Sequence, residues 1–86
     1  MTVAEELLAA VGGPGNVAEL THCWARLRFV LRNPALADET AVSGIPEVVL
    51  AVRQHGQFQV ALRRNLDEVY ESLASQLQGA GDEPTA

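Results

Sequence analysis

A lone thiol lies close to two guanidinium groups in the stretch THCWARLRFVL, residues 21–31. Cys23 is the only cysteine of the chain, and Arg26 and Arg28 follow it within five residues. Nearby cations favour the thiolate form of a cysteine, and a thiolate is a good nucleophile. The planar guanidinium group matches the oxygens of a phosphoryl group. These three residues therefore predict a site that could accept a phosphoryl group on sulfur, stabilise its charge and pass it on.

The same residues also allow a structural interpretation. Lone cysteines are usually small buried hydrophobic residues, and arginines on strands are usually solvated. In that case the chain is a small structural α+β domain with a buried cysteine. Spacing alone favours this second interpretation, so the choice depends on the elements around Cys23 and on the wider sequence pattern.

The length and composition of the chain restrict the classes of protein to which it can belong. Its 86 residues allow one domain with a small core, and 48% of them are hydrophobic. The formal net charge of −5 argues against general nucleic-acid binding, which needs a basic surface. A single cysteine cannot form an internal disulfide, which fits a reducing compartment.

The sequence also bears on location. No apolar run approaches the roughly 18 residues of a membrane span. The N-terminus is acidic and lacks the basic flank of a secretory signal. We therefore expect a cytoplasmic protein without direct membrane insertion, and we expect the isolated domain to be monomeric.

The elements that must position Cys23 follow from the periodicity of the first half. Apolar spacing over residues 4–11 predicts an amphipathic helix, which the Gly-Gly-Pro-Gly run at 12–15 ends. Residues 16–20 could form a short helical turn or enter a strand. Residues 26–32 alternate strictly, with apolar side chains on one face and the arginines on the other. Cys23 is then expected in the connection before this strand, where its thiol can converge with both arginines.

The second half predicts a helix, a hairpin and a final helix. A weak helical pattern covers residues 35–42, and strands at 48–53 and 57–62 flank a turn at 54–56. Asn65 and Glu68 have capping-box spacing at the start of a helix that runs to Leu77. Hairpins joined by helices predict an α+β fold, a four-stranded antiparallel sheet with helices packed on one face, in the order α-β-β-α-β-β-α.

Two stretches together carry a family resemblance. GGPGNVAELTHCWARLRFVL and IPEVVLAVRQHGQFQVAL resemble the IIB domain of the bacterial phosphoenolpyruvate-dependent sugar phosphotransferase system. Within the glucose superfamily, the pattern is most similar to the sucrose, trehalose and β-glucoside branch. The matching residues are Gly12, Gly13, Asn16, Val17, His22, Cys23, Arg26, Leu27, Arg28, Phe29, Ile45, Pro46, Val48, Gly56, Gln57, Phe58, Gln59 and Val60.

The resemblance implies a phosphoryl carrier. Cys23 would take the phosphoryl group from a phosphohistidine of the IIA protein or domain, and a sugar held by the membrane transporter IIC would receive it. Arg26 and Arg28 would hold the phosphoryl oxygens, and no cofactor is expected. Residues 1–77 would form the IIB domain, and residues 78–86 a disordered tail or linker. The resemblance fits a separate subunit and a permease domain equally well.

One departure from the family pattern supports a different function. The family has Ala-Thr after the cysteine, whereas this chain has Trp24-Ala25 and so lacks a hydroxyl near the thiolate. This difference favours a non-catalytic regulatory or docking module with the IIB fold. The presence of Cys23 together with Arg26 and Arg28 argues against that alternative, because docking alone requires no thiol.

Five further residues could adjoin the site, namely His22, Trp24, Ala25, His55 and Gly56. His22 and Trp24 flank the cysteine, and His55 is expected in the turn between the last two strands. The unlike spacing of two histidines and one cysteine argues against a zinc site. We therefore expect no metal.

Overall fold

Two β-hairpins meet through their second strands in one antiparallel sheet. The structure, a computed structural model, describes residues 2–81. Its strands are β1 (Val17–His22), β2 (Arg26–Leu31), β3 (Val48–Gln54) and β4 (Gln57–Leu62), in the order β1-β2-β4-β3. Its helices are α1 (Val3–Ala10), α2 (Glu39–Ser43) and α3 (Leu66–Gly81), with 3₁₀ turns at Pro14–Asn16 and Pro34–Leu36. The predicted four-stranded sheet and element order are confirmed.

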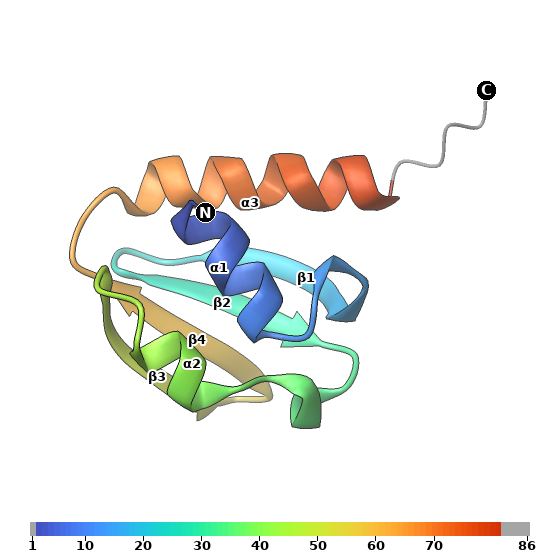
Figure 1. Cartoon of the computed structure of the whole chain (residues 1–86), viewed down its shortest axis with the longest axis horizontal. Helices are drawn as coiled ribbons and strands as arrows, with labels where there is room; N and C mark the ends of the chain where they lie inside the picture. The colour runs from blue at the N-terminus through green and yellow to red at the C-terminus, as the bar shows by residue number, and fades with distance from the viewer. Residues whose placement is uncertain (1, 82–86) are drawn as a thin grey trace.

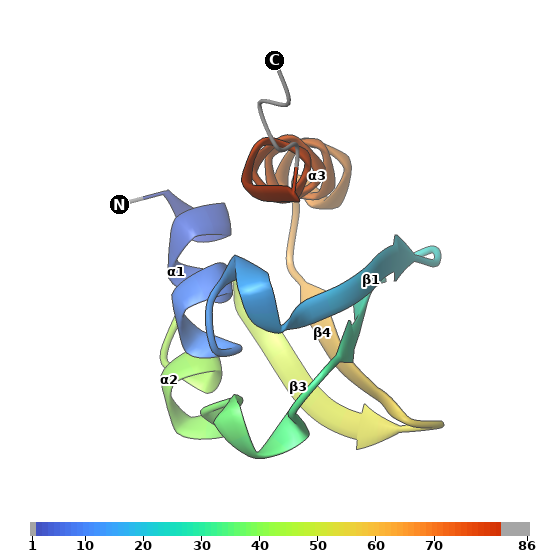
Figure 2. The same ribbon diagram turned by 90° about the vertical axis from the view of Figure 1, so that its right-hand side faces the viewer.

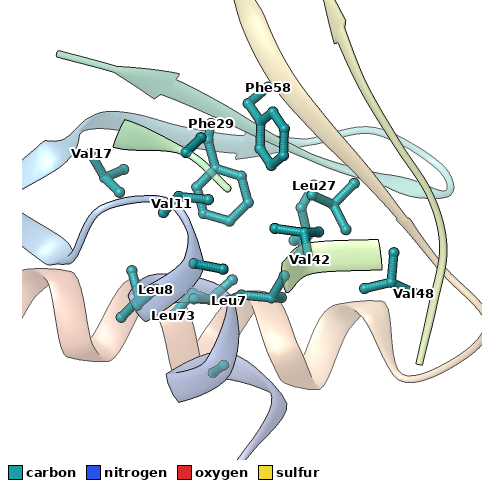
Figure 3. Packing of buried hydrophobic residues seen from close by; sticks show 14 of the residues in the cluster. Leu7, Leu8, Val11, Val17, Leu27, Phe29, Val42, Val48, Phe58 and Leu73 are labelled. Carbon is teal, nitrogen blue, oxygen red and sulfur yellow. The ribbon is translucent and has the colours of Figure 1, made fainter. Parts of the chain in front are cut away.

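All three helices lie on the same face of the sheet (Figures 1 and 2). The core between them and the sheet contains Leu7 and Leu73 from the helices and Phe29 and Phe58 from the central strands, each at most 2% exposed. Figure 3 shows these side chains pointing toward one another. The described helices leave the other face of the sheet uncovered (Figures 1 and 2).

The alternation of β2 divides its residues between the two faces. Leu27, Phe29 and Leu31 are buried under the helices, whereas Arg26, Arg28 and Val30 are half-buried on the uncovered face. Residues paired across neighbouring strands share a face. Thr21 of β1 and Gln59 of β4 are both paired with Arg28, so they also lie on the uncovered face.

One buried amide ties the connection between α1 and β1 to the rest of the fold. Asn16 is 5% exposed. Its Nδ2 donates to the carbonyl oxygens of Val11 at 2.8 Å and Asn33 at 3.0 Å, and its Oδ1 accepts the Asn33 N–H at 2.8 Å. Gly12 has φ 103°, and a Cβ there would lie 2.8 Å from the Asn16 Nδ2. The glycine therefore makes room for the amide.

The segment left open by the sequence, residues 16–20, lies almost wholly in β1, which begins at Val17. The predicted helix over residues 35–42 is instead divided into a 3₁₀ turn and α2. The Asp38 side chain caps α2 by accepting a backbone N–H at 3.0 Å. Arg53 donates to the carbonyl oxygens of Pro34 at 2.9 Å and Ala37 at 3.2 Å, which satisfies groups that a continuous helix would have used internally.

The ends of the terminal helices also differ from the sequence expectation. α3 continues past Leu77 to Gly81, so residues 78–81 are helical, and the remainder of the predicted tail lies outside the described residues. Asn65 directly precedes α3, but its φ of 59° differs from the extended backbone typical of an N-cap. A capping box that the sequence analysis missed is present on α1, where Thr2 and Glu5 bond reciprocally.

Candidate functional site

The turn between β1 and β2 places Cys23 at one end of the sheet. Its N–H donates to the Arg26 carbonyl oxygen at 2.9 Å and closes the hairpin. His22 and Leu27 form the last pair before the turn and face the helices, so Cys23 and Arg26 lie on the uncovered side. Cys23 is half-buried, whereas Trp24 at the tip is 98% exposed. The thiol therefore lies at an accessible end of the molecule.

The surroundings of Cys23 favour its thiolate. Hydrogen bonds from the backbone N–H groups of Ala25 and Arg26 are the main cause that lowers the pKa of Cys23 below its ordinary value. Desolvation opposes this effect, while a hydrogen bond from the Arg28 side chain and the charge of that side chain lower the pKa further. The turn thus offers the sulfur two main-chain donors and one cation, which together stabilise negative charge.

Arg28 is the arginine that acts on the thiol. It is half-buried on the uncovered face, and its Nε is a buried donor without a hydrogen-bond partner among residues 2–81. A buried donor of this kind is costly unless an acceptor satisfies it. The Arg28 side chain therefore combines a charge close to the thiol with unused hydrogen-bonding capacity.

The Arg26 guanidinium contacts two glutamines, and its predicted convergence with Arg28 on the thiol stays a prediction. The Arg26 Nη1 donates to the Oε1 of Gln59 at 3.1 Å and to the Oε1 of Gln54 at 3.4 Å, so the guanidinium is directed along the uncovered face toward β4 and β3. Only the backbone N–H of Arg26 contributes to the pKa of Cys23. Neither glutamine was predicted to contact Arg26, although the alternation of β4 places Gln59 on the face of the arginines.

His22 lies beside Cys23 but on the other face. Its Nδ1 is 3.1 Å from the Cys23 carbonyl oxygen, and its ring packs against Tyr70 of α3 with centroids 4.4 Å apart. Trp24 and Ala25 form the turn itself. Of the five predicted neighbours, these three adjoin Cys23.

His55 and Gly56 do not adjoin the site, which corrects the sequence expectation. They form the turn between β3 and β4, and β4 runs antiparallel to β2. The start of β4 is therefore at the opposite end of the sheet from the turn that carries Cys23. His55 and Gly56 instead line a separate small cavity together with Arg53 and Phe58.

An open depression of about 590 Å³ borders the turn on the side of α3. It is lined by His22, Cys23, Trp24 and the residues 65–68, which include the acidic Asp67 and Glu68. Within residues 2–81, no three His, Cys, Asp or Glu side chains gather in a way that could hold a metal ion. The groups that act on the thiol are the backbone N–H groups of Ala25 and Arg26 and the Arg28 side chain.

Comparison with known proteins relates this arrangement to one family. A family model described as phosphotransferase system, EIIB, matches residues 5–38, which include Cys23, Arg26 and Arg28. The trehalose-specific EIIBC component of Escherichia coli K12 is 40% identical over 72 residues, 84% of this chain. The arbutin-, cellobiose- and salicin-specific EIIBC component of the same strain is 36% identical over 77 residues, or 90% of the chain. The chain belongs to the EIIB family of the phosphotransferase system.

This EIIB domain spans only part of its relatives. It covers 15% of the trehalose-specific component and 16% of the arbutin-, cellobiose- and salicin-specific one. It also covers 12% of the beta-glucoside-specific EIIBCA component of Dickeya chrysanthemi, to which it is 38% identical over 86% of its own length. A crystal structure of one domain of the PTS system IIabc component from Clostridium difficile has a TM-score of 0.74, with 24% identity over 86% of this chain and 77% of that one. That likeness confirms the fold.

The comparisons confirm the family that the sequence resembles. The matched relatives are named as sugar-specific EIIBC and EIIBCA components of the phosphotransferase system. No helix within residues 2–81 is both long enough and apolar enough to cross a membrane.

The lowered pKa of Cys23 predicts a pH profile for this EIIB domain. Because only the thiolate reacts, the rate of alkylation by iodoacetamide should rise with pH around a midpoint below that of cysteine in an unstructured peptide. Arg28→Ala should raise the midpoint. Arg26→Ala should leave it unchanged, since that variant keeps the backbone N–H and removes a guanidinium bound to Gln54 and Gln59. Equal midpoints for native protein and Arg28→Ala would exclude Arg28 from the thiol's surroundings.

Proposed function

We propose that Cys23 carries a phosphoryl group from a phosphohistidine of a IIA protein or domain to a sugar bound by the transporter IIC. In the first step the Cys23 thiolate attacks phosphorus, an S–P bond forms and the P–N bond breaks. The imidazole keeps the electron pair of that bond and takes up a proton. In the second step a sugar hydroxyl loses its proton and attacks phosphorus, and the S–P bond breaks to restore the thiolate.

The observation that carries this proposal is the set of donors around the sulfur. Two backbone N–H groups and the Arg28 side chain lower the pKa of Cys23, so the nucleophile is available at lower pH. Phosphoryl transfer depends mainly on positioning and on stabilising charge that is spread over the phosphoryl oxygens. The unpartnered Nε of Arg28 is a donor that a phosphoryl oxygen on Cys23 could satisfy.

We assign different positions to the two arginines. Arg28 stabilises the thiolate and the phosphoryl group near the sulfur, because it already acts on the thiol. Arg26 would contact the phosphoryl group on the side away from the sulfur, because its guanidinium is directed along the same face toward β4. A guanidinium fork suits this task better than a point charge would.

The partners and the location follow from the same proposal. The names of the relatives combine EIIB with EIIC and in one case also with EIIA, which supports a IIC transporter and a IIA donor as partners. The domain would then work in the cytoplasm, at the inner face of the membrane. The relatives are named for different sugars although each matches most of this chain, so we assign the choice of sugar to the transporter.

One observation favours the alternative of a regulatory or docking module. Trp24 is 98% exposed beside Cys23, and it replaces a small residue of the family pattern. Exposed tryptophans often serve as anchors at protein interfaces. A docking module of this kind would bind a partner without accepting a phosphoryl group.

Intact-mass spectrometry separates the two functions. The protein and Cys23→Ala are incubated side by side with phosphoenolpyruvate, the general phosphotransferase proteins and a compatible IIA. We expect the mass of one phosphoryl group to appear on the native protein alone. Absence of that gain with several IIA partners, each shown to be phosphorylated, would favour the docking module.

A further inference from the structure

Gln59 is buried although it lies on the uncovered face of the sheet. It is 3% exposed, in contrast to the more accessible Gln57 and Ala61 on the same face of β4. It occupies the centre of the sheet, paired with Arg28 of β2 on one side and with Val52 of β3 on the other. A buried amide in such a position needs hydrogen-bond partners, because leaving it unsatisfied would cost free energy.

Both ends of the Gln59 amide are satisfied. Its Oε1 accepts from the Arg26 Nη1 at 3.1 Å, and its Nε2 donates to the Gln57 Oε1 at 3.0 Å. The second acceptor for Arg26, Gln54, is exposed and more distant at 3.4 Å. Gln59 is therefore the main anchor of the Arg26 guanidinium.

This anchor leaves part of the guanidinium available. The two glutamines take their hydrogen bonds from Nη1, so neither of them uses Nε or Nη2. The Arg26 backbone lies beside Cys23, and its guanidinium lies along the uncovered face at Gln59, which is paired with Arg28, the arginine that acts on the thiol. A guanidinium held through one terminal nitrogen can still offer donors to a phosphoryl group on the sulfur.

We infer that Gln59 is a positioning residue, which holds the Arg26 guanidinium on the uncovered face so that it can bind the phosphoryl group carried by Cys23. The inference rests on the proposed function and adds a residue outside the Cys23 turn to it. Gln59 acts through Arg26 and not on the thiol, whose surroundings are the two N–H groups and Arg28. Its loss should therefore spare the thiol and impair the binding of the phosphoryl group.

The first test uses the unphosphorylated protein. Hydrogen bonding through Nη1 restricts rotation of the guanidinium, so ¹⁵N NMR should give separate Nη signals for Arg26, assigned by their loss in Arg26→Ala. Gln59→Met removes both polar atoms at similar volume and should accelerate the rotation about tenfold, averaging the signals. Gln59→Glu keeps the acceptor and should retain them. Gln54→Met, which removes only the longer bond, is the matched control and should also retain them.

The second test uses protein phosphorylated by IIA. The pH titration of the ³¹P signal reports the second ionisation of the phosphoryl group, which a nearby cation shifts to lower pH. The midpoint should rise in Gln59→Met and in Arg26→Ala and stay at the native value in Gln54→Met. The alkylation midpoint of Cys23 should be native in all three variants.

The two tests fail in distinguishable ways. If Gln59→Met is folded and keeps separate Nη signals for Arg26, the positioning role is overturned while the phosphoryl relay stands. A native ³¹P midpoint in Gln59→Met would overturn it equally. If the native protein takes up no phosphoryl group from a phosphorylated IIA, the proposed function fails, and the role of Gln59 toward a phosphoryl group fails with it.

Discussion

Replacement of Cys23 by serine is expected to lower the rate of phosphoryl uptake from IIA by about a thousandfold or more. A serine hydroxyl is a far weaker acid than a thiol. The two N–H groups and Arg28 that favour the thiolate cannot bring an alkoxide to a useful population. The reaction would therefore lose its nucleophile although every donor stays in place.

The substitution should leave the fold intact, because Cys23 is half-buried in a turn and differs from serine by a single atom. The time course of the mass gain, measured at equal concentrations of phosphorylated IIA, gives the rate, and the unfolding temperature serves as the control. A near-native rate in Cys23→Ser would disprove the role of the thiol. If Cys23→Ala still took up a phosphoryl group, another residue would be the acceptor, and the adjacent His22 would be the first to test.

Asn16→Leu is expected to cause the largest loss of stability, about 3 kcal/mol out of the 5–15 kcal/mol typical of a small domain. The leucine has a similar volume but cannot bond to the carbonyl oxygens of Val11 and Asn33 or to the N–H of Asn33. These backbone groups are buried or partly buried, so water replaces the amide poorly.

Loss of this free energy should lower the unfolding temperature by roughly 12 to 24 °C in a domain of this size. Circular dichroism is the suitable measurement, since the single tryptophan is 98% exposed in the folded state and reports little of unfolding. Asn33→Ala is the matched control. It removes an exposed side chain that accepts one N–H at 3.1 Å, and it should cost no more than about 1 kcal/mol. Equal losses of unfolding free energy in the two variants would mean that the hydrogen bonds of the Asn16 amide are not the main stabilising contacts here.

Much of the fold could be predicted because period-two patterns are direct consequences of strand geometry. Leu27, Phe29 and Leu31 could only be buried together if the strand faces the helices, and this placed Arg26 and Arg28 on the other face. The position of Cys23 in a turn followed from the same pattern. The division of residues 35–42 was not predictable, because it depends on Arg53, which comes from a distant strand.

The site was predicted less completely than the fold. Sequence spacing shows that Arg26 and Arg28 share a face, but it does not show which acceptors lie within reach of each guanidinium. Gln54 and Gln59 reach Arg26 through pairing of β4 with β2 and β3, which is set by tertiary structure. His55 was misplaced for a related reason, because a turn can be recognised from local residues while the end of the sheet at which it lies cannot.

The alternation of β2 also limits how this protein can change in evolution. Its six residues lie alternately on the uncovered face and in the core, so a substitution at one position changes one face only. An insertion or deletion of a single residue would turn Leu27, Phe29 and Leu31 toward solvent and the arginines into the core at the same step. Substitutions are therefore the accessible route of divergence in this strand, and its length is effectively fixed.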